Sequence, residues 1–531
     1  MSDHRERLIE LQRRLYARNR RRIAEYQQVG TKGFEAYEAA YHADVEGYQS
    51  VSNLAELTTA MRDANIVLVA DYHTLHLAQK TFLKLARRVR GKRTSIALEF
   101  FSAGHQEVLD AWIAGRIQDK TLLKRTRYTK RWPYDIWPHF QPIVELARRR
   151  GWSLVGIDGA RGPGVSIAET DRRMAEVLVD HLEASPAKTR ILTLVGELHL
   201  AQAHLPLAIK QVAEARGVSA PKVLVVLQNN DTIYWQLLAE QGHHEVEIVR
   251  IDDDRFCVVN TPPVMVQQSY LNWIEYQVDT VDHDHLERNF RHLLGLVARA
   301  LGVRLPRAVR DLAIFGPDDP ELADELEASE LLEEFEERFA EGTRHNAWVI
   351  PSQGLVYLHN LSLNMVGEAA ARLLHGWSLG RDPDRLGNFY GQVIHDAIGF
   401  FGSKVVNPKR KGKHVPYYRA LLNSVRSDAE VDTDQLEAAS AVLLHKAFEQ
   451  GKRIGAFPKL FDLRPVVRER VRRRLGFMLG ERLYYAYERG KVSPARLRGL
   501  MRFPLHDARQ ATALYFVLVR EVDRVALPKR I

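Results

Sequence analysis

The stretch VLVADYHTLHL, residues 67–77, gives the first indication of the fold class of this chain. An apolar run leads directly into Asp71, Tyr72 and His73, and His76 follows three residues later. Continuous apolar runs are typical of strands that helices cover on both faces, as in parallel sheets. A similar ending, in which an apolar run meets acidic or histidine side chains, recurs twice further along the chain. We therefore expect a buried strand whose carboxyl end carries chemically active groups.

Alternating strand and helix patterns fill the chain from about residue 51 to residue 280. Apolar runs predict the strands, and apolar residues at helical spacing predict the helices between them. The alternation predicts an α/β fold with a largely parallel sheet flanked by helices. The predicted strands are NIVLVA (65–70), SIALEF (95–100), SLVGID (153–158), ILTLVGE (191–197), KVLVVLQ (222–228) and EVEIVRI (245–251). The predicted helices include residues 75–89, 103–115, 143–151 and 169–185.

The strand signal fades after residue 280, and long helical patterns such as residues 285–302 and 432–451 take its place. The acidic stretch 317–342 carries spaced leucine and phenylalanine residues and predicts an amphipathic helix. A short hairpin is expected within residues 347–361. The predicted organisation is a basic N-terminal helical segment at 1–50, an α/β domain at 51–280 and a mainly α-helical domain at 281–531.

The composition is that of an ordinary globular protein. With 531 residues, of which 45% are hydrophobic and 27% charged, the chain is long enough for two or more domains. Charges occur throughout its first 26 residues, and no run of 18 apolar residues occurs, so the sequence predicts neither a signal peptide nor a membrane span. We therefore expect a cytoplasmic protein. The single cysteine, Cys257, cannot form an internal disulfide and is expected in the core.

The net charge of +9 is unevenly distributed. Six arginines fall between residues 13 and 22, and further basic runs cover residues 407–419 and 464–476. Such runs could contact nucleic acid or an anionic membrane. Because no aromatic stacking platform is evident beside them, we favour solvated basic faces and expect neither nucleic acid nor a membrane as the main partner.

Three of the predicted strands end in groups that bind metals and protons. Because the carboxyl ends of parallel strands meet at one edge of a sheet, these groups are expected to line one crevice. Imidazole and carboxylate together suit a divalent metal such as manganese, cobalt, zinc or iron, and they equally suit acid–base work on a bound substrate. An acid such as Glu99, at the end of an apolar strand, is costly to bury without a partner. The predicted set is Asp71, His73, His76, Glu99, Glu197 and His199.

The segment RYTKRWPYDIWPHFQP, residues 127–142, is unusually aromatic. Trp132 and its neighbours could wall a flat ligand such as a porphyrin. Tyr128, Tyr134 and His139 are then the candidate axial ligands of the iron. From the composition alone we favour the other interpretation, that these aromatic side chains close one end of the sheet and belong to the core.

From about residue 60 to residue 215, the chain resembles the ChaN haem-binding uptake family of the Tiki-like superfamily, whose relatives include metal-dependent peptidases and erythromycin-esterase-like hydrolases. The resemblance implicates Asp71, His73, Glu99, Gly196 and His199, with His76 and Glu197 as neighbours. This chain has Ala70-Asp71 where the family has Gly-Glu, which shortens the acid by one methylene. The matching segments, in order, are ADYHTLH, IALEFFSAGHQEVLDAWIAGR, YTKRWPYDIWPHFQPIVELARRRG, ETDRRMAEVL and LTLVGELHL.

Two functions follow from the resemblance and the residues together. The first is a haem- or iron-binding protein that holds its ligand at the carboxyl edge of the sheet. The second is a peptidase or esterase in which a metal bound by His73, Glu99 and His199 activates water, with Asp71 or Glu197 as general base. We favour the binding protein because the pattern is nearest to the haem-binding branch. Its partners are then haem or a small-molecule or peptide ligand, and a homodimer stays open.

Overall fold

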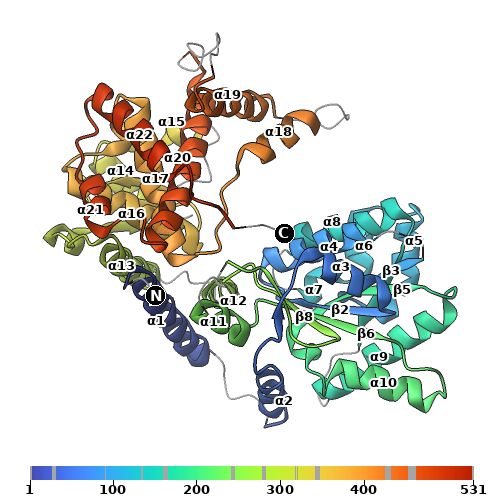
Figure 1. Cartoon of the computed structure of the whole chain (residues 1–531). Helices are drawn as coiled ribbons and strands as arrows, with labels where there is room; N and C mark the ends of the chain where they lie inside the picture. Colours follow the sequence, from blue (N-terminus) through green and yellow to red (C-terminus); the bar gives the residue numbers. More distant parts are fainter. Residues whose placement is uncertain are drawn as a thin grey trace. The chain divides into compact units, whose positions relative to one another are not determined.

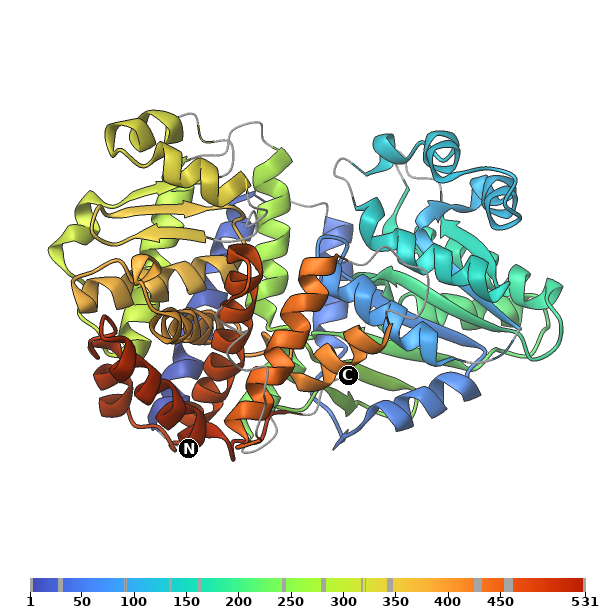
Figure 2. The same cartoon turned by 90° about the horizontal axis from the view of Figure 1, so that it is seen from above.

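The chain divides into two compact units. One consists of residues 1–15 and 278–527, and the other of residues 16–277 and 528–531. Figures 1 and 2 show both units from two directions. The computed structural model describes residues 3–26, 32–89, 91, 93–132, 136–159, 165–240, 245–277, 283–316, 319, 321–340, 347–424, 432–452 and 462–528.

The α/β unit, residues 16–277, is built on an eight-stranded sheet in the order β1-β7-β8-β6-β2-β5-β3-β4. The strands from β8 to β4 in that order run parallel, and β7 pairs antiparallel with both β1 and β8. The predicted α/β fold with a largely parallel sheet is therefore confirmed. The strands are β1 (Ser50–Val51), β2 (Ile66–Asp71), β3 (Thr94–Ser102), β4 (Ser153–Asp158), β5 (Arg190–Gly196), β6 (Val223–Gln228), β7 (Ile248–Arg250) and β8 (Arg255–Val258).

Helices lie on both faces of this sheet, with α3, α4 and α8 on one side and α9 and α10 on the other (Figure 1). All six residues of β2 are buried, as expected for a strand covered on both faces. The helices are α2 (Lys32–Ala43), α3 (Leu54–Asp63), α4 (His76–Arg88), α5 (Gln106–Ile113), α6 (Asp119–Arg125), α7 (Tyr128–Arg131), α8 (Trp137–Arg150), α9 (Ile167–Ala184), α10 (Leu205–Ala215), α11 (Asp231–Ala239) and α12 (Pro263–Gln277), and α1 (Asp3–Tyr26) spans the division between the units.

Two details of the strands differ from the sequence prediction. Strand β5 ends at Gly196, and Glu197–Leu200 forms a 3₁₀ turn, so Glu197 and His199 do not extend the strand. The predicted strand 245–251 is shorter, and the RFCV segment forms a further strand, β8, that pairs with β6 and β7.

The second unit is mainly helical, as predicted, and also contains a three-stranded sheet in the order β10-β11-β9. Strands β10 and β11 are the antiparallel hairpin expected within residues 347–361. The single acidic helix expected at 317–342 is instead two helices, α14 and α15, because Glu330 has a φ of 56° and interrupts the helix. The elements are α13 (His283–Leu301), β9 (Ala313–Phe315), α14 (Leu322–Ala328), α15 (Leu332–Ala340), β10 (Ala347–Ile350), β11 (Leu355–Leu358), α16 (Leu363–Leu379), α17 (Phe389–Val406), α18 (Val415–Ser424), α19 (Thr433–Glu449), α20 (Pro465–Glu488), α21 (Pro494–Met501) and α22 (Ala508–Val522).

Helices α16, α17 and α20 pack closely in the core of this unit. The packing depends on glycine: a Cβ atom added to Gly476 of α20 would lie 2.9 Å from the carbonyl oxygen of Val393 in α17. None of the described helices is both long enough and apolar enough to cross a bilayer.

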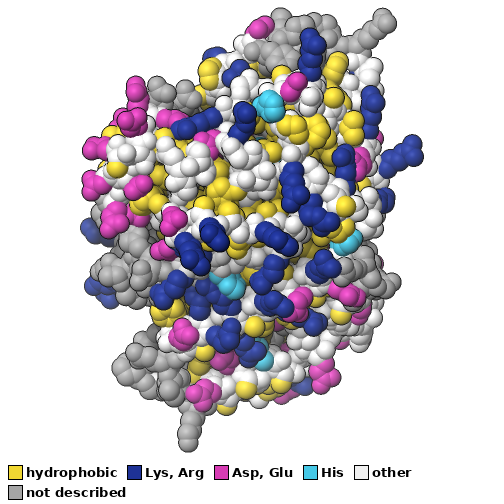
Figure 3. All heavy atoms as spheres, turned by 90° about the vertical axis from the view of Figure 1, so that its left-hand side faces the viewer, with side chains coloured by type: hydrophobic (Ala, Val, Ile, Leu, Met, Phe, Trp, Pro, Cys, Tyr) yellow, Lys and Arg dark blue, Asp and Glu magenta, His cyan; other side chains and the backbone are white. Residues whose placement is uncertain are grey.

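The basic run 464–476 of the helical unit is largely engaged by acids of the same unit. In the run 464–476, Arg464 pairs with Glu437 at 2.8 Å, and Arg473 pairs with the buried Glu368 at 2.9 Å. Figure 3 shows one face on which Lys and Arg side chains gather across the middle, next to apolar side chains, while acidic side chains lie mainly at the left edge and toward the bottom.

Candidate functional site

A carboxylate held between two histidines lies at the carboxyl ends of β2, β3 and β5. The Nε2 atom of His73 is 3.9 Å from Oε2 of Glu99, and the Nε2 atom of His199 is 3.9 Å from Oε1. The backbone N–H of Gly196 donates to Oε2 of the same carboxylate at 2.6 Å. The three groups meet because β5 lies between β2 and β3, and neighbouring parallel strands end at the same edge.

Each histidine forms a hydrogen bond through Nδ1 with an aspartate. Nδ1 of His73 is 2.7 Å from Oδ2 of Asp71, and Nδ1 of His199 is 2.6 Å from Oδ1 of Asp171. A hydrogen bond from Nδ1–H to a carboxylate fixes the orientation of the imidazole ring, so that Nε2 points to the opposite side. The two Asp–His pairs therefore present their Nε2 atoms to the same carboxylate, that of Glu99.

The other oxygen of Asp71 accepts from Nε2 of Gln79 at 2.5 Å. Both oxygens of Asp71 are thus engaged, one by His73 and one by Gln79. This arrangement differs from the role of free general base that the hydrolase hypothesis gives to Asp71. Its place behind His73 is that of a positioning group.

Helix α2 of the N-terminal segment completes the cluster. The hydroxyl of Tyr37 donates to Oδ2 of Asp171 at 2.7 Å and lies 3.1 Å from Nδ1 of His199. Its ring stacks on the ring of His204, with centroids 3.5 Å apart and planes 6° apart. His204 in turn donates from Nδ1 to the carbonyl oxygen of Leu198 at 2.6 Å. Residues of the segment predicted at 1–50 therefore belong to the surroundings of this site.

Sequence reasoning missed Asp171 and Tyr37. A signal for Asp171 was present, because the buried residues of α9 are Asp171, Met174, Ala175, Leu178 and Val179. That spacing is the apolar stripe of an amphipathic helix, and an aspartate within it needs a buried partner. No comparable signal marks Tyr37, because its contacts are with residues more than 100 positions away.

The cluster is largely closed to solvent. The side chains of Asp71, Glu99, Asp171 and His199 are between 2% and 9% exposed, whereas that of His73 is 28% exposed. Trp132 packs edge-on against the His73 ring, with centroids 4.9 Å apart. His73 is therefore the most exposed of these five side chains.

Neighbouring carboxylates raise the pKa of both imidazoles of the cluster. Burial lowers the pKa of His73, but its hydrogen bond to Asp71 and the nearby carboxylates outweigh burial and raise the pKa to about 9. For His199, burial is likewise outweighed by the hydrogen bond to Asp171 and by Glu99, and its pKa is raised. With a pKa of about 9, the His73 imidazole is mostly protonated at neutral pH and then donates from both nitrogens. In the described part of the chain, no group of three or more His, Cys, Asp or Glu side chains is placed to hold a metal ion.

Glu197 lies near this cluster but is not part of its hydrogen bonds. Burial raises the pKa of Glu197 to about 7, with smaller effects from Asp71, Glu99 and His73. Its carboxyl group therefore exchanges a proton near neutral pH.

His76 lies apart from the Glu99 cluster. It is the exposed first residue of α4. The centroid of its ring lies 4.2 Å from the ring centroid of His139 in the first turn of α8. Burial, together with His139 and Lys80, lowers the pKa of His76 to about 4. The structure thus divides the predicted metal set in two: His73, Glu99 and His199 in the closed cluster, and His76 beside His139.

The aromatic segment is mostly core rather than an open wall. Tyr128 and Trp132 are each 7% exposed, and the Trp132 ring stacks with that of Phe100 at a centroid distance of 5.5 Å. The hydroxyl of Tyr128 accepts the backbone N–H of Trp137 at 2.8 Å. These contacts match the interpretation that the aromatic residues close the end of the sheet. His139 is half-buried, and Tyr134 lies outside the described residues.

One part of the chain matches a known protein family. Residues 57–162 match the model of the family described as "Haem-binding uptake, Tiki superfamily, ChaN". The predicted resemblance is confirmed over these residues, which include His73, Glu99 and His139 but not Asp171 or His199.

One solved structure, titled "Cofacial heme binding to ChaN of Campylobacter jejuni", is similar to this chain at 15% identity and a TM-score of 0.30. The match covers 40% of this chain and 98% of that chain. No curated protein matches the chain.

Proposed function

We propose that the α/β unit binds haem on its surface beside His76 and His139, one of which supplies the axial nitrogen to the iron. The observation that carries the proposal is the position of this histidine pair. Both side chains reach solvent, their rings lie 4.2 Å apart, and both belong to the segment that matches a haem-binding uptake family.

The chemistry of the pair fits haem. A haem iron in a protein takes an axial nitrogen, oxygen or sulfur ligand, and histidine is a common one. The lowered pKa of His76 leaves its imidazole uncharged at neutral pH, so a nitrogen lone pair is available. Tyr128 fits less well, because its hydroxyl is buried and already accepts a hydrogen bond from Trp137.

In this proposal, the Glu99 cluster is a supporting structure beneath the binding surface. Its ion pairs and the Gly196–Glu99 hydrogen bond join the ends of β2, β3 and β5, and Trp132 packs edge-on against the His73 ring. Trp132 follows α7 and precedes α8, the helix that carries His139. The cluster therefore contacts the aromatic segment through Trp132.

Titration of the full-length chain with hemin tests the proposal. The wild-type protein is expected to give a saturable Soret band at about one hemin per chain. The variant with both His76→Ala and His139→Ala is expected to bind at least tenfold more weakly, because it loses the axial ligand. His42→Ala is the matched control, since His42 is 61% exposed on α2 and lies outside the proposed surface.

Two results would refute this function. One is weak hemin binding by the wild-type protein that does not saturate. The other is a double variant whose Soret band and affinity equal those of His42→Ala, because the histidine pair would then have no part in binding.

A further inference from the structure

The helical unit contains a cavity of about 700 Å³ between α18, α19, α20 and α22. Ligand sites for small molecules commonly have volumes of about 300 to 1,000 Å³. Apolar side chains form part of its wall: Val415, Met478, Val519 and Leu527. A small organic molecule can therefore fit in this open cavity, whose lining residues all belong to the helical unit.

Cations predominate among the charged side chains that line this cavity. Five of them are Lys or Arg and two are acids. Both acids are already engaged: Glu449 pairs with Lys446 and accepts the hydroxyl of Tyr515 at 2.6 Å, and Asp523 lies 3.6 Å from Arg482. The cavity therefore presents an excess of positive charge that its own acids do not neutralise.

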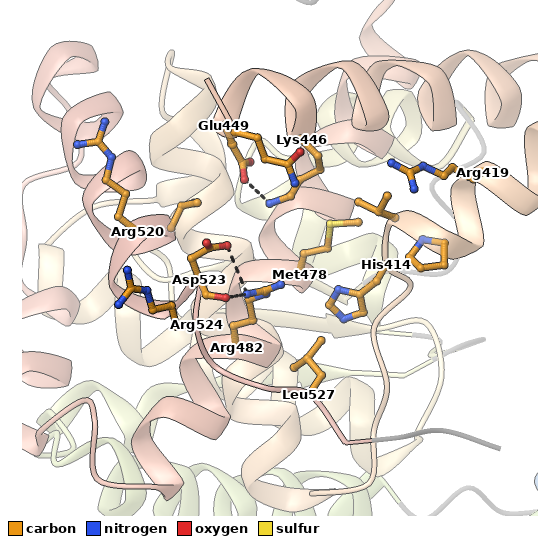
Figure 4. Close-up of a pocket in the computed structure, with 14 residues that line it drawn as sticks. His414, Arg419, Lys446, Glu449, Met478, Arg482, Arg520, Asp523, Arg524 and Leu527 are labelled. Carbon is orange, nitrogen blue, oxygen red and sulfur yellow. Dashed lines mark hydrogen bonds and ion pairs between the residues drawn. The ribbon is translucent and has the colours of Figure 1, made fainter. Parts of the chain in front are cut away.

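Three arginines supply this excess. Within the described residues, the guanidinium groups of Arg419, Arg520 and Arg524 make no hydrogen bond or ion pair. Figure 4 shows Arg419 reaching in from α18 on one side, while Arg520 and Arg524 lie on the opposite side, at the end of α22 and just after it. Met478 and the Lys446–Glu449 pair lie between the two sides.

We propose that this cavity binds a soluble organic anion that combines an apolar body with a phosphate or carboxylate group. The planar guanidinium group forms paired hydrogen bonds with both kinds of anion, so Arg419, which reaches into the cavity, would hold the charged end, and Arg524 would add positive charge from the opposite side. The apolar body would lie against Met478 and Val519, where its burial removes apolar surface from water. This site is separate from the proposed haem surface, which lies in the other unit.

Isothermal titration calorimetry on the full-length chain tests the proposal with octyl phosphate as the probe. Inorganic phosphate has the charge without the apolar body, and octyltrimethylammonium has the apolar body with the opposite charge. Octyl phosphate is expected to bind saturably at one site and at least tenfold more tightly than either control compound. These differences follow from the need for both charge and apolar contact.

Two variants, each with a change in the cavity lining, test whether octyl phosphate binds in this cavity. The double variant Arg419→Gln with Arg524→Gln is expected to bind octyl phosphate at least tenfold more weakly. Its matched control is Arg468→Gln with Arg509→Gln, two exposed arginines of α20 and α22 outside the cavity lining, which should leave affinity within twofold. Val519→Trp, at a half-buried position of the wall, should block binding by filling the space.

Three results would overturn the proposal. The first is that octyl phosphate does not bind the wild-type protein. The second is that the two double variants weaken octyl phosphate binding equally, since that would show only a general charge effect. The third is binding to phosphatidylglycerol vesicles that is tighter than binding to octyl phosphate and is lost in the Arg419→Gln, Arg524→Gln variant, because the cavity would then serve a lipid surface and not a soluble anion.

Discussion

Replacing Asp171 by Asn tests how strongly the closed cluster holds the α/β unit together. The Asp171 carboxylate accepts hydrogen bonds from His199 at 2.6 Å and from Tyr37 at 2.7 Å, and its side chain is only 4% exposed. A hydrogen bond to a charged group contributes about 1.5 to 3 kcal/mol. Asn keeps the shape and one acceptor oxygen but loses the charge, so we expect a loss of about 3 kcal/mol in unfolding free energy.

Differential scanning calorimetry of the full-length chain measures this loss. For a unit the size of residues 16–277, a loss of about 3 kcal/mol lowers the midpoint of unfolding by roughly 6 to 12 °C. The matched control is Asp180→Asn on the same helix, because the Asp180 side chain is 64% exposed and its ion pair with Arg216 contributes little. A midpoint for Asp171→Asn that falls no further than that of Asp180→Asn would refute the proposed strength of the cluster.

The remaining predictions concern pH and helix packing. Because the folded pKa of His73 is about 9, the stability that its protonated form adds to the folded state is fully present below about pH 6.5 and is lost as the pH rises through 9. Asp71→Asn should flatten this pH dependence of the unfolding free energy, measured by urea titration at about pH 6 and about pH 9.5. An unchanged pH dependence in this variant would contradict the Asp71–His73 pairing. Gly476→Ala should destabilise the helical unit by about 1 to 3 kcal/mol, because the added Cβ would lie 2.9 Å from the Val393 carbonyl oxygen. Gly499→Ala, whose Cβ meets nothing within 4 Å, should not destabilise it, and equal midpoints for the two glycine variants would rule out the packing explanation.

The α/β fold could be predicted because its determinants are local. The runs at 65–70 and 191–197 are mostly apolar, and they correspond to the neighbouring buried strands β2 and β5. The rule that parallel strands end at one edge was then sufficient to place His73, Glu99 and His199 near one another. No knowledge of side-chain packing was needed for that step.

The finer arrangement of the site could not be predicted, because it depends on contacts between distant segments. Tyr37 reaches His199 from a helix that the sequence separates from it by 162 positions. His76 follows the β2 strand closely, but it begins α4, and that position turns its side chain toward His139 on α8. His73 and His76 come from the same sequence motif but lie in different surroundings, because α4 begins at His76.

Electron–nuclear double resonance of the ferric hemin complex tests the proposed function most directly. The full-length chain would be labelled with ¹⁵N only at its histidines, so that any ¹⁵N coupling to the iron reports a histidine ligand. The proposal predicts one strongly coupled ¹⁵N nucleus in the wild-type protein, and its loss when both His76 and His139 are replaced by Ala. A complex without ¹⁵N coupling, or one whose coupling survives in the double variant, would contradict haem binding through this pair.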